Sequence, residues 1–320
     1  MEYRHHPVAS QTGPDFSAAI VDNGYAWWYV DALSDCGRHG LTLIAMLGCV
    51  FSPYYARARR RGPTPALEHS ALNIALYRGG GRRWAMTERS AAAVKRSSKE
   101  LRIGSSTLEW RDHALEINVD EVTAPWPRPI KGHIRLIPEA ITAEAQRLDT
   151  LGRHLWWPIA VRARIEVEFS NPKLCWEGSA YFDANQGAAP LEDDFIGWNW
   201  SRAHTQDRSI VFYDTVSRES GLSRELALQF DRSGKLSTLS APPQATLPRS
   251  GWGIERLARC DLQAQPTIVE TLESAPFYAR SIIDTTIDGS AVQCFHESVS
   301  LTRFASRWVQ TLLPVRLPRR

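Results

Sequence analysis

The chain has 320 residues, of which 43% are hydrophobic and 23% are charged, so its composition is globular and excludes a disordered chain. The formal net charge of +3 is too small to indicate nucleic-acid binding. The length allows one large all-β domain or two domains of ordinary size. Twelve Trp residues would suit a deep apolar pocket, although they would equally fill a β core.

Strand signals dominate the chain. An aromatic strand is predicted over residues 26–30, and apolar strands over 41–50 and 71–77. Residues 108–110 and 115–119 flank a turn and predict a hairpin. In residues 159–169, apolar and charged side chains alternate, which places the apolar ones on one face of a strand. Further strands are expected at residues 178–182, 209–215, 225–230 and 291–301.

Helix signals are few. Residues 91–101 could form a short helix or a polar loop, and residues 138–151 have helical spacing of their apolar positions. A short terminal helix is expected within residues 301–313, where Phe304, Trp308 and Leu312 would share one face. Many short strands between Gly and Pro turns favour β-barrels or sandwiches. A domain boundary is placed near residues 185–205.

The chain start and the cysteines bear on its location. Residues 1–7 lack the apolar core of a signal peptide, and the most apolar stretch, residues 41–51, is too short to span a bilayer. We therefore expect a cytoplasmic protein that is at most peripheral to a membrane. The five cysteines are scattered without a close pair, so we expect reduced, mostly buried thiols rather than a zinc or disulfide framework.

Several familiar catalytic motifs are missing from the sequence. It has no GxGxxG after a strand, no phosphate-binding GxxxxGK[ST], no HExxH and no GxSxG. His39, His69, His113, His133, His204 and His296 are isolated, and each is interpreted as a structural or surface histidine.

Two pairs of residues, each two positions apart, stand out. On an extended segment, His154 and Trp156 point the same way, and so do Tyr181 and Asp183. An imidazole beside an indole is a reasonable catalytic pair, and an Asp at the end of an aromatic strand is placed to have a raised pKa because desolvation disfavours the carboxylate. The alternatives are a core Trp with a hydrogen-bonded His, and an Asp that caps a turn. The residues alone favour these alternatives.

A set of sequence blocks resembles the carotenoid 1,2-hydratases, also called hydroxyneurosporene synthases, of photosynthetic bacteria. The resemblance covers nearly the whole chain. The order and spacing of the blocks together make the resemblance specific. The blocks lie at residues 24–32, 51–56, 69–77, 84–89, 181–187, 198–202 and 312–319.

The resemblance implies an all-β fold of two lipocalin-like β-barrels in tandem with few short helices, at residues 1–190 and 191–320. It implies cofactor-independent addition of water to the terminal double bond of acyclic carotenoids such as neurosporene and lycopene. It also implies that the functional residues are His154, Trp156, Tyr181 and Asp183, with no metal-binding or cofactor-binding residue. In the mechanism that we expect, Asp183 is the general acid, Tyr181 and Trp156 stabilise the tertiary carbocation, and His154 positions the water or takes its proton.

Two other functions stay open at this point: a non-catalytic lipocalin-like isoprenoid carrier and a related two-barrel pericyclase. Because carotenoids reside in the bilayer, we expect peripheral contact with membrane lipid. The candidate docking surfaces are residues 51–61, which combine aromatic and Arg residues, and residues 308–320. The alternative is that these basic clusters simply form a solvated surface without a lipid partner. The sequence leaves the oligomeric state open.

Overall fold

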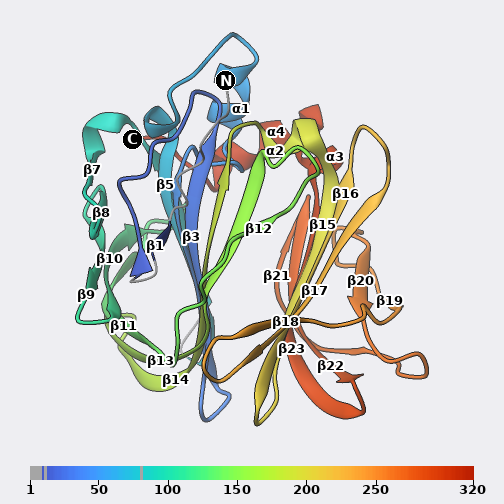
Figure 1. Ribbon diagram of the computed structural model, residues 1–320. Coiled ribbons are helices and arrows are strands. Elements are labelled where there is room, and N and C mark those ends of the chain that lie inside the picture. Colours follow the sequence, from blue (N-terminus) through green and yellow to red (C-terminus); the bar gives the residue numbers. More distant parts are fainter. Residues whose placement is uncertain (1–8, 11–12, 80–81) are drawn as a thin grey trace. The chain divides into compact units, whose positions relative to one another are not determined.

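The computed structural model describes residues 9–10, 13–79 and 82–320, and the chain divides into two compact units (Figure 1). The first unit is formed by residues 1–190 and 311–320, and the second by residues 191–310. Residues 1–7, on which the expectation of a missing signal peptide rests, lie outside the described residues. No helix in the described part of the chain is both long and apolar enough to cross a membrane.

The first unit is built on one long antiparallel sheet. Among the described residues this sheet has twelve strands in the order β6-β5-β4-β3-β14-β13-β11-β10-β9-β8-β7, with β12 paired to β13. Its strands are β3 (Tyr25–Ser34), β4 (His39–Leu47), β5 (Ser70–Arg78), β6 (Arg83–Arg89), β7 (Val94–Arg96), β8 (Glu100–Ile103), β9 (Ser106–Arg111), β10 (Ala114–Val122), β11 (Pro129–Pro138), β12 (Gln146–Arg147), β13 (His154–Asn171) and β14 (Leu174–Gly187). A separate short pair is formed by β1 (Ala9–Ser10) and β2 (Gly13–Pro14).

The sheet curls into a nearly closed barrel. Side chains of β6 reach across to the far part of the sheet: the Arg89 guanidinium donates to Glu121 of β10 at 2.8 Å, and Arg83 donates to the carbonyl of Pro129 in β11 at 2.6 Å. Ala85 of β6 and Leu101 of β8 belong to the same buried core. Both ends of the sheet therefore enclose one hydrophobic interior.

The second unit contains a smaller antiparallel sheet in the order β18-β17-β16-β15-β23-β22-β21, together with the pair β19-β20. Its elements are α2 (Leu191–Asp194), β15 (Phe195–His204), β16 (Arg208–Ser217), β17 (Ser223–Asp231), β18 (Leu236–Thr238), β19 (Gln244–Leu247), β20 (Arg256–Arg259), β21 (Thr267–Ala275), β22 (Tyr278–Ile287), β23 (Ser290–Ser300), α3 (Leu301–Phe304) and α4 (Arg307–Leu312), whose last two residues belong to the first unit. Its buried core includes Phe212 and Ile283.

The mostly-β prediction is confirmed, and so are most of the individual strands. The alternation predicted over residues 159–169 appears in β13, where Ile165, Val167 and Phe169 are buried and the residues between them are exposed. The hairpin predicted over residues 108–119 is β9 paired with β10. The terminal helix predicted within residues 301–313 forms as the two short helices α3 and α4.

The helical spacing over residues 138–151 proves misleading. The segment after Pro138 runs extended beside β13: the Thr142 amide donates to the carbonyl of Ile159 at 2.9 Å, and its hydroxyl donates to the carbonyl of Pro158 at 2.6 Å. The indole of Trp157 in turn donates to Thr142. Tertiary hydrogen bonds thus replace the intrahelical ones that the spacing indicated.

Residues 91–101 also differ from the expectation of a helix or a polar loop. Only the 3-10 turn η2 (Ala91–Ala93) is helical, and β7 and β8 then form a hairpin. A helix that the patterns do not predict is α1 (Pro53–Arg59), which Ser52 caps by accepting from the amides of Tyr54 and Tyr55 at 3.1 Å each. All five cysteines are free, and Cys49, Cys260 and Cys294 are buried, in agreement with the expected thiols.

The C-terminal tail pairs with the edge strand β6 of the barrel at Glu88. The Glu88 amide in β6 donates to the carbonyl of Pro318, and the Arg320 amide donates to the carbonyl of Glu88, both at 2.9 Å. The Arg319 guanidinium donates to the fully buried Glu88 carboxylate at 2.7 Å, and His69 lies 2.9 Å from the same oxygen. Pairing and a buried ion pair therefore protect an edge that would otherwise offer free backbone groups.

Candidate active site

The four predicted site residues lie on two neighbouring strands of the barrel sheet. His154 and Trp156 come from β13, and Tyr181 and Asp183 come from β14, which pairs with β13 on one side and with β3 on the other. Successive side chains of a strand point to opposite faces. Because Phe182 is part of the barrel core, Tyr181 and Asp183 lie on the other face.

Asp183 is the meeting point of two hydrogen-bond donors. The Trp156 indole Nε1–H and the Tyr181 hydroxyl each donate to Asp183 Oδ2, both at 2.9 Å. Trp156 and Tyr181 are fully buried, and Asp183 is 5% exposed. Both donors act on the same carboxyl oxygen, so a neutral acid that keeps both hydrogen bonds carries its proton on the other oxygen, Oδ1.

The structure brings three of the four predicted residues into direct contact and gives His154 a different partner. His154 Nδ1 shares a hydrogen bond of 2.9 Å with the hydroxyl of Tyr25, and the two rings stack at 5.8 Å. Asp149 fixes the start of β13 by accepting the His154 amide at 2.8 Å. His154 therefore lies two residues from Trp156 along β13, but its imidazole is hydrogen-bonded to Tyr25 of the strand β3.

Sequence reasoning missed the contribution of β3. Tyr29 stands directly opposite Asp183 in the pairing of β3 with β14, and its ring meets that of Tyr181 edge-on at 6.2 Å. β3 also contributes Asp31, a fully buried carboxyl group that stands opposite Tyr181. The only signal for these residues was their place in the block of residues 24–32, because no local spacing connects β3 with β14.

A small residue makes room for the Tyr25–His154 pair. Gly187 stands opposite both Tyr25 and His154 in the strand pairings. A Cβ atom added at Gly187 would overlap the Tyr25 ring and lie 2.7 Å from His154 Nδ1. Both rings are fully buried, so neither can move aside easily.

We therefore expect Gly187→Ala to break the Tyr25–His154 hydrogen bond. Overpacking a buried site typically costs about 1–3 kcal/mol of stability, and urea unfolding would measure this loss. The matched control is Gly251→Ala, because the nearest atom to its added Cβ is 3.9 Å away. Equal stability of the two variants would contradict the proposed packing role of Gly187.

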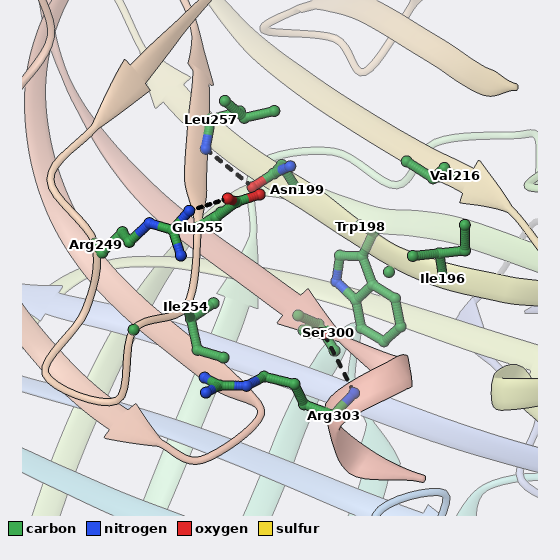
Figure 2. Close-up of a pocket in the computed structure, with 13 residues that line it drawn as sticks. Ile196, Trp198, Asn199, Val216, Arg249, Ile254, Glu255, Leu257, Ser300 and Arg303 are labelled. Atoms are coloured by element: carbon green, nitrogen blue, oxygen red, sulfur yellow. Dashed lines mark hydrogen bonds and ion pairs between the residues drawn. The ribbon is translucent and has the colours of Figure 1, made fainter. Parts of the chain in front are cut away.

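A pocket of about 370 Å³ lies elsewhere, in the second unit (Figure 2). Its apolar wall includes Ile196, Trp198 and Ile254, and Arg249 and Arg303 also line it. None of the four predicted site residues lines this pocket. Among the described residues, no group of three or more His, Cys, Asp or Glu side chains is arranged to hold a metal ion.

Fold and site together define a mostly-β protein in which a buried carboxyl group is held by an indole and a phenol. The family described as carotenoid hydratase CrtC matches residues 43–320. The chain is 50% identical over 308 residues to the acyclic carotenoid 1,2-hydratase of Thiocapsa roseopersicina, which covers 96% of this chain and 76% of that protein. It is 44% identical over 313 residues to the acyclic carotenoid 1,2-hydratase of Rubrivivax gelatinosus, with the same coverage. The chain therefore belongs to the carotenoid hydratase family, as its sequence blocks indicated.

Solved structures of similar fold are far more distant in sequence. A crystal structure of a putative AttH from Nitrosomonas europaea has a TM-score of 0.61 at 14% identity and covers 93% of this chain and 96% of its own. The crystal structure of CghA with Sch210972 has a TM-score of 0.56 at 12% identity and covers 91% and 96%. At such low identity, these similarities concern the fold alone.

Proposed function

We propose that this carotenoid hydratase adds water to the terminal, 1,2 double bond of an acyclic carotenoid such as neurosporene or lycopene and forms a tertiary alcohol. The observation that carries the proposal is the buried Asp183 carboxyl group, whose Oδ2 accepts from both Trp156 and Tyr181. The names of relatives at 50% and 44% identity supply the substrate class.

In the first step, Asp183 donates the proton on Oδ1 to the less substituted carbon of the double bond, which leaves a tertiary carbocation and an Asp183 carboxylate. The Trp156 and Tyr181 donors hold this carboxylate through Oδ2. The faces of the two aromatic rings stabilise the cation, and such contacts contribute about 0.5–2 kcal/mol. Water then bonds to the cationic carbon and loses one proton, and Asp183 regains a proton for the next turnover.

His154 has a separate role in this proposal. Its imidazole positions the incoming water or takes the proton that the water releases, and Tyr25 orients the ring through the 2.9 Å hydrogen bond. Timing matters at this step. Water has to reach the cation before a neighbouring proton is lost, since otherwise an isomerised alkene forms instead of an alcohol.

The proposal extends to the architecture and location of the chain. Two lipocalin-like barrels in tandem would form the scaffold of the site, and the curled sheet of the first unit supports this proposal for one of them. Because Asp183 and Tyr181 lie on the face of this sheet opposite its core residue Phe182, the reacting end of the substrate would bind against that face and not in the barrel interior. The protein would work at the cytoplasmic surface of a membrane as a peripheral protein, because its substrate is dissolved in lipid.

Incubation with detergent-dispersed lycopene in isotopically labelled water tests the function. We expect products that have gained one water per hydrated end and carry the labelled oxygen, as measured by mass spectrometry. Unchanged lycopene would instead indicate the isoprenoid carrier, and an unlabelled isomer of the same mass would indicate the pericyclase. Either result would overturn the proposal.

A further inference from the structure

Two tryptophans of the second unit form an exposed aromatic pair. Trp252 and Trp308 are 46% and 45% exposed, and their rings stack with centroids 6.3 Å apart. Single exposed apolar side chains are ordinary, but a stacked pair of indoles in contact with water is an unusual surface for a protein that works alone in solution. Amphipathic Trp rings prefer the boundary between water and lipid headgroups.

Both tryptophans lie on segments that hydrogen bonds or buried side chains fix in place. Trp252 lies in a turn that the Gly253 amide closes by donating to the carbonyl of Ser250 at 2.7 Å. Trp308 lies on α4, next to the fully buried Val309. The preceding helix, α3, is anchored by the fully buried Phe304. The surface therefore presents its two indoles without the need to order a loop first.

Arginines accompany the pair. The Arg303 guanidinium lies 5.9 Å from the centre of the Trp308 ring and donates to the carbonyl of Trp252, so it joins the two segments. Arg307 and Arg249 are exposed close by in the sequence, at positions next to Trp308 and three before Trp252. We call these five residues the tryptophan–arginine surface.

Acidic side chains limit the positive charge. Glu255 forms an ion pair with Arg249, and the acidic helix α2 packs against α3. These carboxylates offset part of the positive charge of the surface, so electrostatic attraction alone would be modest, and the indoles would supply an essential share of any membrane affinity.

The pocket of the second unit opens beside this surface. Arg249, Gly253 and Arg303 line it together with the apolar side chains of Trp198 and Ile254 (Figure 2). Two arginines of the surface, Arg249 and Arg303, thus also line the pocket, where they would face a negatively charged headgroup.

The other basic cluster lacks these features. Arg57 and Arg61 are exposed, but the neighbouring Tyr55 is fully buried, and the Arg59 guanidinium covers its ring at 4.2 Å. The aromatic run that made residues 51–61 a docking candidate therefore faces the protein interior in part.

We propose that the tryptophan–arginine surface docks the chain onto an anionic lipid bilayer. This inference rests on the proposed function, because an acyclic carotenoid has to be taken from a bilayer. An interfacial anchor needs apolar contact with lipid and attraction to anionic headgroups. The indoles would supply the first at the headgroup level, and the arginines would supply the second against lipid phosphates.

Flotation of the full chain with vesicles tests the inference. The wild type should float with vesicles of equimolar phosphatidylcholine and phosphatidylglycerol, and less with phosphatidylcholine alone. The double variant Trp252→Ala/Trp308→Ala, and separately Arg303→Gln/Arg307→Gln, should each bind the mixed vesicles about tenfold more weakly. High salt should weaken the binding of the wild type more than that of the arginine variant.

The matched control is Trp126→Ala, since Trp126 is a 78% exposed tryptophan of the first unit. It should float like the wild type. Equal flotation of the wild type and the Trp252→Ala/Trp308→Ala variant, or an equal loss in Trp126→Ala, would overturn the inference.

Activity assays separate this inference from the proposed function. The double Trp variant should hydrate detergent-dispersed lycopene at the wild-type rate but lose activity on vesicle-embedded lycopene. If the wild type hydrates neither form while the flotation differences persist, the proposed function fails and the docking surface stands. If hydration in detergent also falls in the double Trp variant, the surface acts in catalysis and the docking inference is wrong.

Discussion

Asp183→Asn should abolish hydration of detergent-dispersed lycopene while the thermal stability of the chain stays close to that of the wild type. Asn has nearly the same shape as Asp, and its amide oxygen can accept from Trp156 and Tyr181 as Oδ2 does. The amide cannot deliver a proton, however. General acid catalysis typically contributes about a hundredfold to ten-thousandfold, so we expect a loss of about a thousandfold or more. Chromatography of the products and a thermal melt measure the two effects.

Asp31 provides the comparison for this experiment. It is a second buried carboxyl group, and it stands opposite Tyr181 on the neighbouring strand β3. Under our proposal, Asp31→Asn keeps more activity than Asp183→Asn. The reverse order, with activity lost in Asp31→Asn and kept in Asp183→Asn, would move the acid to β3 and refute the role of Asp183.

Local patterns in the sequence predicted those parts of the fold that local chemistry determines. Residues 159–169 alternate because one face of β13 is buried, and that regularity is visible without any knowledge of its neighbours. The segment after Pro138 misled the prediction because its hydrogen bonds go to Pro158 and Ile159, which helical periodicity does not consider.

The site shows the same division. Tyr181 and Asp183 are two residues apart, and this spacing alone predicts that they share one face of β14. The same holds for His154 and Trp156 at the start of β13. The choice of partners, by contrast, depends on the register between strands far apart in the chain. This register places Tyr25 beside His154 across 129 residues and leaves Gly187 as the residue that makes room for them. Sequence spacing alone contains no measure of such a register.

Substitutions of Trp156 should lower the activity in steps that separate its hydrogen bond to Asp183 from its aromatic face. Trp156→Phe keeps an aromatic face but removes the Nε1–H donor to Asp183, so we expect partial activity. Trp156→Ala removes both and leaves a cavity in a fully buried site, which typically costs about 3–5 kcal/mol of stability. We expect this variant to lose most of its activity even at a temperature where it remains folded.

Tyr181→Phe is the matched control for Trp156→Phe, because it removes the other donor to Asp183 Oδ2 and leaves an aromatic ring in place. If the donors mainly hold the carboxyl group, the two Phe variants should lose activity by a similar factor, about tenfold to a hundredfold each for a hydrogen bond to a charged group. The further drop from Trp156→Phe to Trp156→Ala then measures the aromatic face. Equal losses in Trp156→Phe and Trp156→Ala, with both chains folded, would mean that the indole acts through its hydrogen bond and its shape. The carbocation would then be stabilised elsewhere, and Tyr181 and the Tyr29 ring that meets it edge-on would be the next residues to substitute.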